Sequence, residues 1–222
     1  MTRGRGTARR ATRKPVVVLV GEGQNDREVL RILLEAFNPD LKGRIVTIND
    51  KIPLRDATGD VLHGRVTRLA GLVRARAARE GADIAAVFVH EDFDQRESAA
   101  ADQTRSKVQA ALSRQLGETA SYILIAWEVE AWMLLFPDAL TAFKARWSVP
   151  RARRHVNTGL IDDPKRVMVK EVARAGPPYR ESDAPAIFEK VVALSHHTRP
   201  AGTNRSWELL VQLAASAGTA RE

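Results

Sequence analysis

Acidic side chains follow three apolar runs of this chain, at the points where the runs end. They are Glu22 after residues 16–20, Asp92 and Asp94 after residues 84–89, and Glu128 and Glu130 after residues 122–127. If these runs are parallel strands, their carboxyl ends meet at one edge of a sheet, where open α/β sheets bind ligands. Carboxylates brought together repel one another unless a cation neutralises them. Mg²⁺ or Mn²⁺ suits such oxygen ligands.

The spacing of the acids adds to this prediction. Residues two apart on a strand point the same way, so Asp92 and Asp94 share a face if the strand persists that far. Glu128 and Glu130 have the same spacing, and Asp26 lies one helical turn past Glu22. Each motif by itself is more often a turn, a solvated loop or an acid near a helix N-terminus. Their occurrence after successive strands of one sheet favours a metal site.

The elements that must position these acids alternate along the chain. Apolar, β-branched runs predict strands at 16–20, 44–48, 84–89 and 122–127, and amphipathic segments predict helices at 25–37, 63–80 and 98–116. This alternation predicts a Rossmann-like α/β fold, with a mainly parallel four-stranded sheet flanked by helices. A continuous apolar run such as 16–20 is typical of a strand covered on both faces.

The segment around Glu22 has its own turn chemistry. Gly21 and Gly23 permit a backbone that residues with a Cβ would resist. Asn25 is expected to cap the following helix, with Glu28 at the capping-box position. This turn has two glycines and lacks the third glycine of the dinucleotide-binding fingerprint, so a Rossmann enzyme is not indicated.

Beyond residue 130 the pattern becomes helical. Short helices are predicted at 130–135, 138–147, 164–173, 184–194 and 207–215, the last three capped by Asp163, Asp183 and Ser206. A basic connection with Arg151, Arg153 and Arg154 lies among them. We therefore expect a basic arm over residues 1–14, an α/β domain over 15–140, and an α-helical extension over 141–222 packed on the sheet.

Composition indicates the cellular compartment and the kind of partner that this chain is expected to have. The chain has no cysteine, and no apolar run approaches the length of a membrane span. The first apolar run is too short for a signal peptide and leads into acids, so we expect a cytoplasmic protein without a membrane partner. Of the net charge of +8, residues 1–14 carry +6. That arm is interpreted equally well as a solvated tail or as a non-specific phosphate contact.

The motifs resemble a known family. Gly21-Glu22-Gly23 after a first strand, with Asp92-Phe93-Asp94 after a later one, resembles the Toprim domain of topoisomerases, bacterial primases and OLD-family nucleases. Asp26 resembles the OLD-type version in particular. The segments 128–132 and 163–165 look like small stand-alone Toprim-like proteins of bacterial phage-defence loci, the RloB-like group. The resemblance covers roughly residues 16–140 and is weak beyond them.

The resemblance implies roles for the acids. Glu22 would be a general acid/base or metal ligand, and Asp92 and Asp94 would hold Mg²⁺ (or Mn²⁺). Asp26 and Glu130 would complete a second metal position, near Glu128. Lys165, or else Lys170, is a candidate for stabilising the transition state, from its sequence context.

These observations lead to three hypotheses. The first is a Mg²⁺-dependent nuclease that cleaves phosphodiester bonds, of DNA rather than RNA, in phage defence with a separate ATPase partner, because the chain has no phosphate-binding P-loop. The second is a non-catalytic Toprim-like subunit that binds an ATPase and nucleic acid. The third and weakest is phosphoryl transfer on small molecules. A homo-oligomer is left open.

Overall fold

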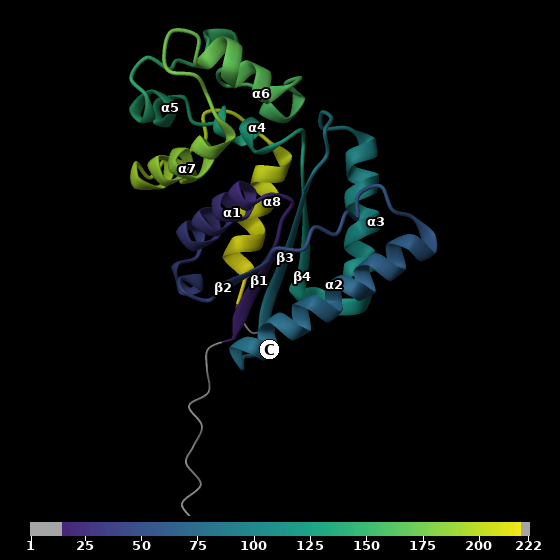
Figure 1. Cartoon of the computed structure of the whole chain (residues 1–222). Coiled ribbons are helices and arrows are strands. Elements are labelled where there is room, and N and C mark those ends of the chain that lie inside the picture. Colours follow the sequence, from purple (N-terminus) through teal and green to yellow (C-terminus); the bar gives the residue numbers. More distant parts are fainter. Residues whose placement is uncertain (1–14, 219–222) are drawn as a thin grey trace, which may run out of the picture.

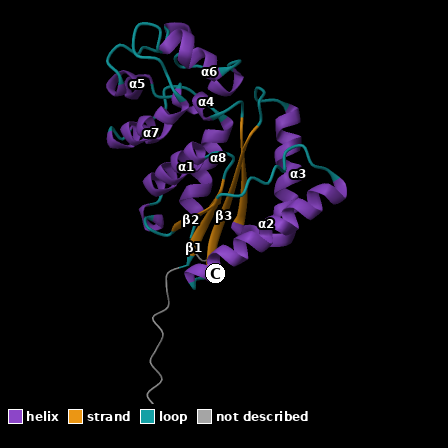
Figure 2. Cartoon of the chain, viewed as in Figure 1, coloured by secondary structure: helices purple, strands orange, loops and turns teal. Residues whose placement is uncertain are grey.

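A computed structural model describes residues 15–218 of the chain. It contains a four-stranded sheet in which every strand is parallel to its neighbours, in the order β2-β1-β3-β4. The strands are β1 (Val16–Val20), β2 (Ile45–Ile48), β3 (Ile84–Asp92) and β4 (Ala120–Ile125). Helices flank the sheet (Figures 1 and 2). The predicted α/β, Rossmann-like class is therefore confirmed.

The sheet is buried on both faces, as the apolar run of β1 predicts. Val17 and Leu19 of β1 contribute to one cluster of buried apolar side chains, and Val16, Val18 and Val20 to the other. Because side chains alternate along a strand, only a run that is apolar at every position can fill both cores. The central strand β1 is accordingly buried at all five of its positions.

Each face of the sheet carries two long helices. On one side lie α1 (Gln24–Phe37) and α8 (Arg205–Ser216), and on the other α2 (Gly59–Glu80) and α3 (Ala99–Leu116) (Figure 1). The α8 helix comes from the end of the described chain, and it packs against β4 and α1. The predicted extension thus contributes one of the two helices that cover this face of the sheet.

The remaining helices gather beyond the carboxyl ends of the strands (Figure 1). They are α4 (Val129–Met133), α5 (Pro137–Phe143), α6 (Pro164–Val167), which continues into a π-helical turn (Met168–Val172), and α7 (Ala184–Ala193). The α7 helix packs on α1, and the large side chains Trp132, Trp147 and Phe188 join the same buried cluster as Val17 and Leu19. One core therefore runs from the sheet into this helical group.

Several predicted boundaries and caps differ from the structure. The α2 helix begins four residues before position 63, β3 continues three residues past position 89, and β4 begins and ends two residues early. Asp163 caps α6 by accepting a hydrogen bond from the Arg166 N–H at 2.9 Å, as predicted. Asn204 rather than Ser206 caps α8, because its Oδ1 accepts from the N–H groups of Ser206 and Trp207. Asp183 makes no cap bond to α7 and pairs instead with Lys144.

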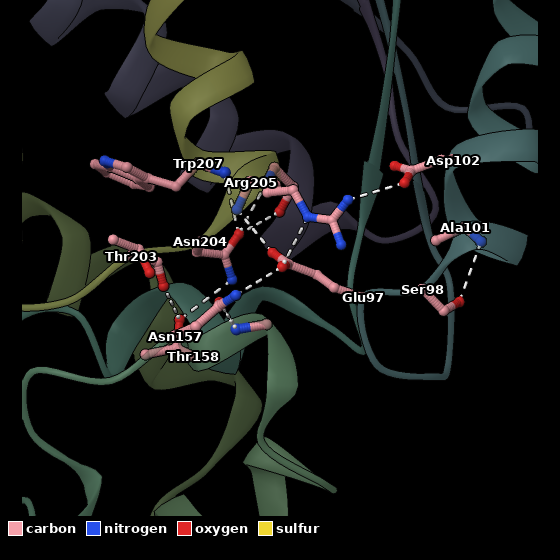
Figure 3. A network of polar contacts seen from close by, with 12 residues as sticks. Glu97, Ser98, Ala101, Asp102, Asn157, Thr158, Thr203, Asn204, Arg205 and Trp207 are labelled. Atoms are coloured by element: carbon pink, nitrogen blue, oxygen red, sulfur yellow. Dashed lines mark hydrogen bonds and ion pairs between the residues drawn. The ribbon is translucent and has the colours of Figure 1, made fainter.

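A polar network fastens α8 to the rest of the fold (Figure 3). Glu97, just before α3, has a nearly buried side chain that accepts hydrogen bonds from Arg205 N–H at 2.7 Å and from Asn157 Nδ2 at 2.9 Å. Asn204 Nδ2 donates to Thr158 Oγ1 at 3.2 Å. The start of α3, the loop at 157–160 and the first turn of α8 are thereby held together, although they are far apart in sequence.

The described helices are too short or too polar to span a bilayer. Crossing its hydrocarbon core takes about 20 mostly apolar residues. Within residues 15–218, none of the helices combines that length with sufficient apolar character.

The loop that enters α8 gives a test of this packing. A Cβ on Gly202 would stand 2.2 Å from the carbonyl oxygen of Val156, which is backbone and cannot rotate away. We expect Gly202→Ala to lower the free energy of unfolding by about 1–3 kcal/mol, the usual cost of overpacking. Gly71→Ala on α2 is the matched control, since within residues 15–218 no atom outside the adjoining turns of its own helix lies within 4 Å of the new Cβ. The control should stabilise by about 0.5–1 kcal/mol.

Urea unfolding of both variants, followed by circular dichroism, measures this difference. A Gly202→Ala protein as stable as Gly71→Ala would show that the loop is not packed against Val156 in this way.

Candidate functional site

The carboxyl edge of the sheet faces the helical group across a cavity of about 310 Å³. Four acids predicted from the sequence line this cavity together with the predicted lysine: Asp26, Asp92, Glu128, Glu130 and Lys165. Glu181 contributes a fifth carboxylate. Side chains from α1, from the end of β3, from the segment after β4 and from the extension thus converge on one space. The convergence follows from parallel topology, which places all these strand ends at one edge.

Glu22 lies beside this group rather than among the residues that line the cavity. Its side chain is 24% exposed, and its Oε2 lies 3.7 Å from Lys51 Nζ. Burial raises the pKa of the Glu22 carboxyl, and the negative charge of Asp92 raises it further, while Lys51 opposes both. Glu22 and Asp92 therefore interact electrostatically although they come from different strands.

The glycines around Glu22 are needed for a different reason from the one expected. Neither Gly21 nor Gly23 has a positive φ, so neither supplies an unusual backbone conformation. The constraint is close approach, since a Cβ on Gly23 would stand 2.8 Å from Asp26 Oδ2, and one on Gly21 2.9 Å from Arg27 Cγ. Small size, and not backbone freedom, is what these positions require.

Asp26 fixes the start of α1. Its Oδ2 accepts a hydrogen bond from Gly23 N–H at 2.9 Å, so the helix begins after Gly23. The predicted cap at Asn25 with Glu28 is therefore wrong by two residues, and Glu28 instead pairs with Arg31. Because a single carboxylate oxygen makes the cap, the other oxygen of Asp26 remains for the cavity.

Asp92 and Asp94 do not share a face. The β3 strand ends at Asp92, and Asp94 has a φ of 55°, in the left-handed region, so the alternation of side chains stops between them. Asp94 is not among the residues lining the cavity; its side chain is 70% exposed and pairs with Arg55 Nη1 at 2.7 Å. The prediction that the two side chains share a strand face is corrected, and of the two aspartates Asp92 is the one that lines the cavity.

Glu128 is held by Lys165 at two points. One carboxylate oxygen accepts from Lys165 N–H at 3.0 Å, and the other lies 2.8 Å from Lys165 Nζ. The same ammonium lies 3.0 Å from Glu181. Burial lowers the pKa of Lys165, but its hydrogen bonds to the two glutamates outweigh this and raise it overall. Burial also raises the pKa of Glu128, against the effect of Lys165. Lys165 is thus an internal counter-ion in the cavity.

Glu130 is the most deeply buried acid of the cavity, with 5% of its surface exposed. Its Oε1 accepts a hydrogen bond from the hydroxyl of Tyr179 at 2.6 Å. Burial first, and the negative charge of Glu128 second, raise the pKa of Glu130 to about 7. At neutral pH this carboxyl is therefore poised between its protonated and ionised forms.

The basic residues predicted to contact nucleic acid lie elsewhere. Arg153 pairs with Glu171 at 3.1 Å, and Arg154 donates to the carbonyl of Val149, whereas Arg151 is exposed. Lys170 lines a separate hollow, with Arg153 and Arg166, and not the acidic cavity. The basic arm, residues 1–14, lies outside the described residues.

The donor set fits a hard cation by its chemistry. The acidic side chains that line the cavity are all carboxylates, the oxygen donors that hard cations prefer. Over residues 15–218, no three histidine, cysteine, aspartate or glutamate side chains are grouped so that they could hold a metal ion without rearrangement.

Sequence reasoning missed several residues that shape this site. Tyr179 and Lys51 come from irregular segments whose position depends on tertiary packing. Glu91 faces away from the cavity and anchors the loop before α2, accepting from the N–H groups of Leu54 and Arg55. His90 had a usable signal, because it lies two residues before Asp92 on the same strand face.

Comparison with known proteins adds no relative. No family model, curated protein or solved structure matches this chain. The resemblance to the Toprim domain therefore rests on the motifs quoted above and stays a prediction.

Proposed function

We propose that this protein is a Mg²⁺-dependent nuclease that hydrolyses phosphodiester bonds of nucleic acid, DNA rather than RNA. The observation that carries the proposal is the single cavity lined by Asp26, Asp92, Glu128 and Glu130, beside Glu22. Such a concentration of carboxylates costs free energy through mutual repulsion, which a bound cation relieves. Burial first, and the charges of neighbouring carboxylates second, raise the pKa values of Glu22 and Glu130.

Each acidic residue of the site, and Lys165, is proposed to have a separate role in the reaction. Asp92, Asp26 and Glu128 would hold the cation, which when bound would polarise a phosphate and lower the pKa of a bound water. Glu22, whose pKa is raised, would accept or donate a proton at the attacking or leaving oxygen. Lys165 would offset negative charge on the phosphate once released from Glu128.

A nucleic-acid substrate agrees with the charge of the chain. The net charge is +8 while the cavity itself is acidic, so the positive charge lies outside the site. Contacts from arginines and lysines to the phosphate backbone provide affinity without sequence preference. We infer that the basic arm and the segment 151–154, through its exposed Arg151, hold the backbone while the acidic cavity acts on it. A defence role with an ATPase partner belongs to the same proposal.

The direct test uses purified protein with supercoiled plasmid, single-stranded DNA and RNA, each with Mg²⁺, Mn²⁺ or EDTA. We expect cleavage of DNA with either cation and none in EDTA. Glu22→Gln should slow cleavage by about 100-fold or more, as expected for loss of a general acid/base. Glu118→Gln is the matched control, an exposed acid at the opposite end of the sheet. Absence of metal-dependent cleavage by the parent on all three substrates would reject the proposal.

A second candidate, a non-catalytic subunit that binds an ATPase and nucleic acid, is favoured by one observation. The Lys165 ammonium already pairs with Glu128 and Glu181 within the cavity, so part of the negative charge is balanced without a metal ion. Co-purification from the native host distinguishes the two candidates. If an ATPase co-purifies and the protein is inactive on every substrate, the non-catalytic subunit is supported. Cleavage by the isolated chain would support the nuclease.

A further inference from the structure

His90 lies directly behind the acidic cavity. It sits on β3 two residues before Asp92, and its side chain is completely buried. One side of the ring faces the turn after β1, where Nδ1 would lie 3.6 Å from a Cβ on Gly21. On the other side, Nε2 lies 3.3 Å from Asp92 Oδ1. The ring thus fills the space between the Gly21 turn and the Asp92 carboxylate.

Three buried polar atoms meet here without a well-formed hydrogen bond. They are His90 Nδ1, His90 Nε2 and Asp92 Oδ1. A buried polar atom without a partner costs about 1–3 kcal/mol, so native proteins seldom keep one without a functional reason. A leucine or phenylalanine could fill this volume without that cost, as Phe88 does two residues earlier on the same face. Packing alone therefore does not explain a histidine at position 90.

The cations nearby are committed to other groups. Arg27 Nη1 donates to the carbonyl of Gly21 at 3.0 Å, and Arg55 donates to the backbone carbonyl of Asp92 and to the side chain of Asp94. Lys165 pairs with Glu128 and Glu181. Among the described residues, His90 is the polar side chain that stands within ion-pair distance of the Asp92 carboxylate.

We propose that His90 is a positioning residue that holds one oxygen of Asp92, so that the other is presented to the cation. The proposal rests on the proposed metal-dependent function and deepens it. A hydrogen bond from Nε2–H to Oδ1 would restrict rotation of the carboxylate, and the two atoms already lie 3.3 Å apart. Groups that orient a metal ligand in this way commonly change metal affinity 10- to 100-fold.

The experiment measures Mn²⁺ affinity of the full chain by electron paramagnetic resonance, with no substrate present. His90→Leu removes the donor, His90→Gln restores an N–H donor, and Tyr122→Phe is the control, a buried neighbour whose hydroxyl bonds to Glu91 instead. We expect His90→Leu to weaken Mn²⁺ binding roughly 10- to 100-fold. His90→Gln should stay closer to the parent, and Tyr122→Phe should match it. Thermal unfolding of each variant checks the fold, and His90→Phe replaces His90→Leu if the latter does not fold.

A second measurement does not involve metal. In ¹⁵N-histidine spectra of the metal-free protein, the ring signals that disappear in His90→Gln identify His90, and they should shift in Asp92→Asn. Unchanged ring signals, or a folded His90→Leu protein that binds Mn²⁺ like the parent, would overturn the positioning role and leave the proposed function standing. A parent that binds no Mn²⁺ would overturn both.

Discussion

Asp92→Asn is expected to reduce metal-dependent cleavage by on the order of 100-fold or more. Asp92 is the acid through which the parts of the site are linked: it lines the cavity, raises the pKa of Glu22 by its charge, and lies against His90. An asparagine of the same size removes the charge and retains only one ligand oxygen. Groups that merely orient a ligand alter affinity 10- to 100-fold, so loss of the ligand should exceed that range.

Asp94→Asn is the matched control for this prediction. It makes the same chemical change two residues away, but Asp94 is largely exposed and pairs with Arg55 outside the cavity. An exposed ion pair contributes little, so the variant should keep both its fold and most of its cleavage rate. Initial rates on the preferred substrate, with saturating Mg²⁺, compare the two variants.

The two possible failures have different meanings. If both variants lose activity equally, the left-handed turn at Asp94 rearranges when the cation binds, and the paired-aspartate hypothesis is right after all. If neither loses activity, the cavity is not the catalytic site. The result expected from the geometry is a large loss for Asp92→Asn alone.

Much of the fold was predictable because its signals are local. The β-branched run at 16–20 and the helix cap at Asp163 each reflect backbone preferences that neighbouring residues determine. The parallel arrangement then follows from alternation of strands and helices. The position of α8 did not follow, because no local pattern tells which layer a distant helix will cover.

The site was predictable only in part, for the same reason. That acids after successive parallel strands lie at one edge is a consequence of topology, and Asp92, Glu128 and Glu130 do line one cavity. The orientation of Asp94 depends on a single residue leaving the extended region, which alternation cannot anticipate. Likewise, Tyr179 reaches Glu130 across 49 positions of sequence, through packing of the extension.

Glu130→Gln is expected to stabilise the metal-free protein at alkaline pH. Glu130 is buried, and its pKa is raised from an ordinary value of 4.5 to about 7. Above pH 7 the folded protein must therefore ionise Glu130 at a cost in free energy, whereas the unfolded chain ionises the same group without that cost. At about 1.36 kcal/mol for each pH unit, the full cost above pH 7 is roughly 3 kcal/mol. Glutamine remains uncharged, and its Oε1 can still accept the hydrogen bond from Tyr179.

The sign of the pH dependence follows from proton binding. Between pH 4.5 and about 7 the folded state binds more protons at Glu130 than the unfolded state does, so the stability of the parent falls as pH rises. Below pH 4.5 Glu130 is protonated in both states, and it lowers the stability of the folded protein by nothing. Above pH 7 both are ionised and the loss is constant. The difference between Glu130→Gln and the parent should therefore be near zero at pH 4.5 and largest by pH 8.

Urea unfolding in EDTA at pH 4.5 and pH 8 measures this difference. Glu189→Gln on α7 is the control, an exposed glutamate whose replacement should change the free energy of unfolding by less than about 0.5 kcal/mol at either pH. Adding Mg²⁺ at pH 8 should then stabilise the parent more than Glu130→Gln, because a cation offsets the buried charge that only the parent carries. A Glu130→Gln protein less stable than the parent at pH 8 in EDTA would contradict the expectation that the buried, ionised carboxylate of Glu130 destabilises the fold.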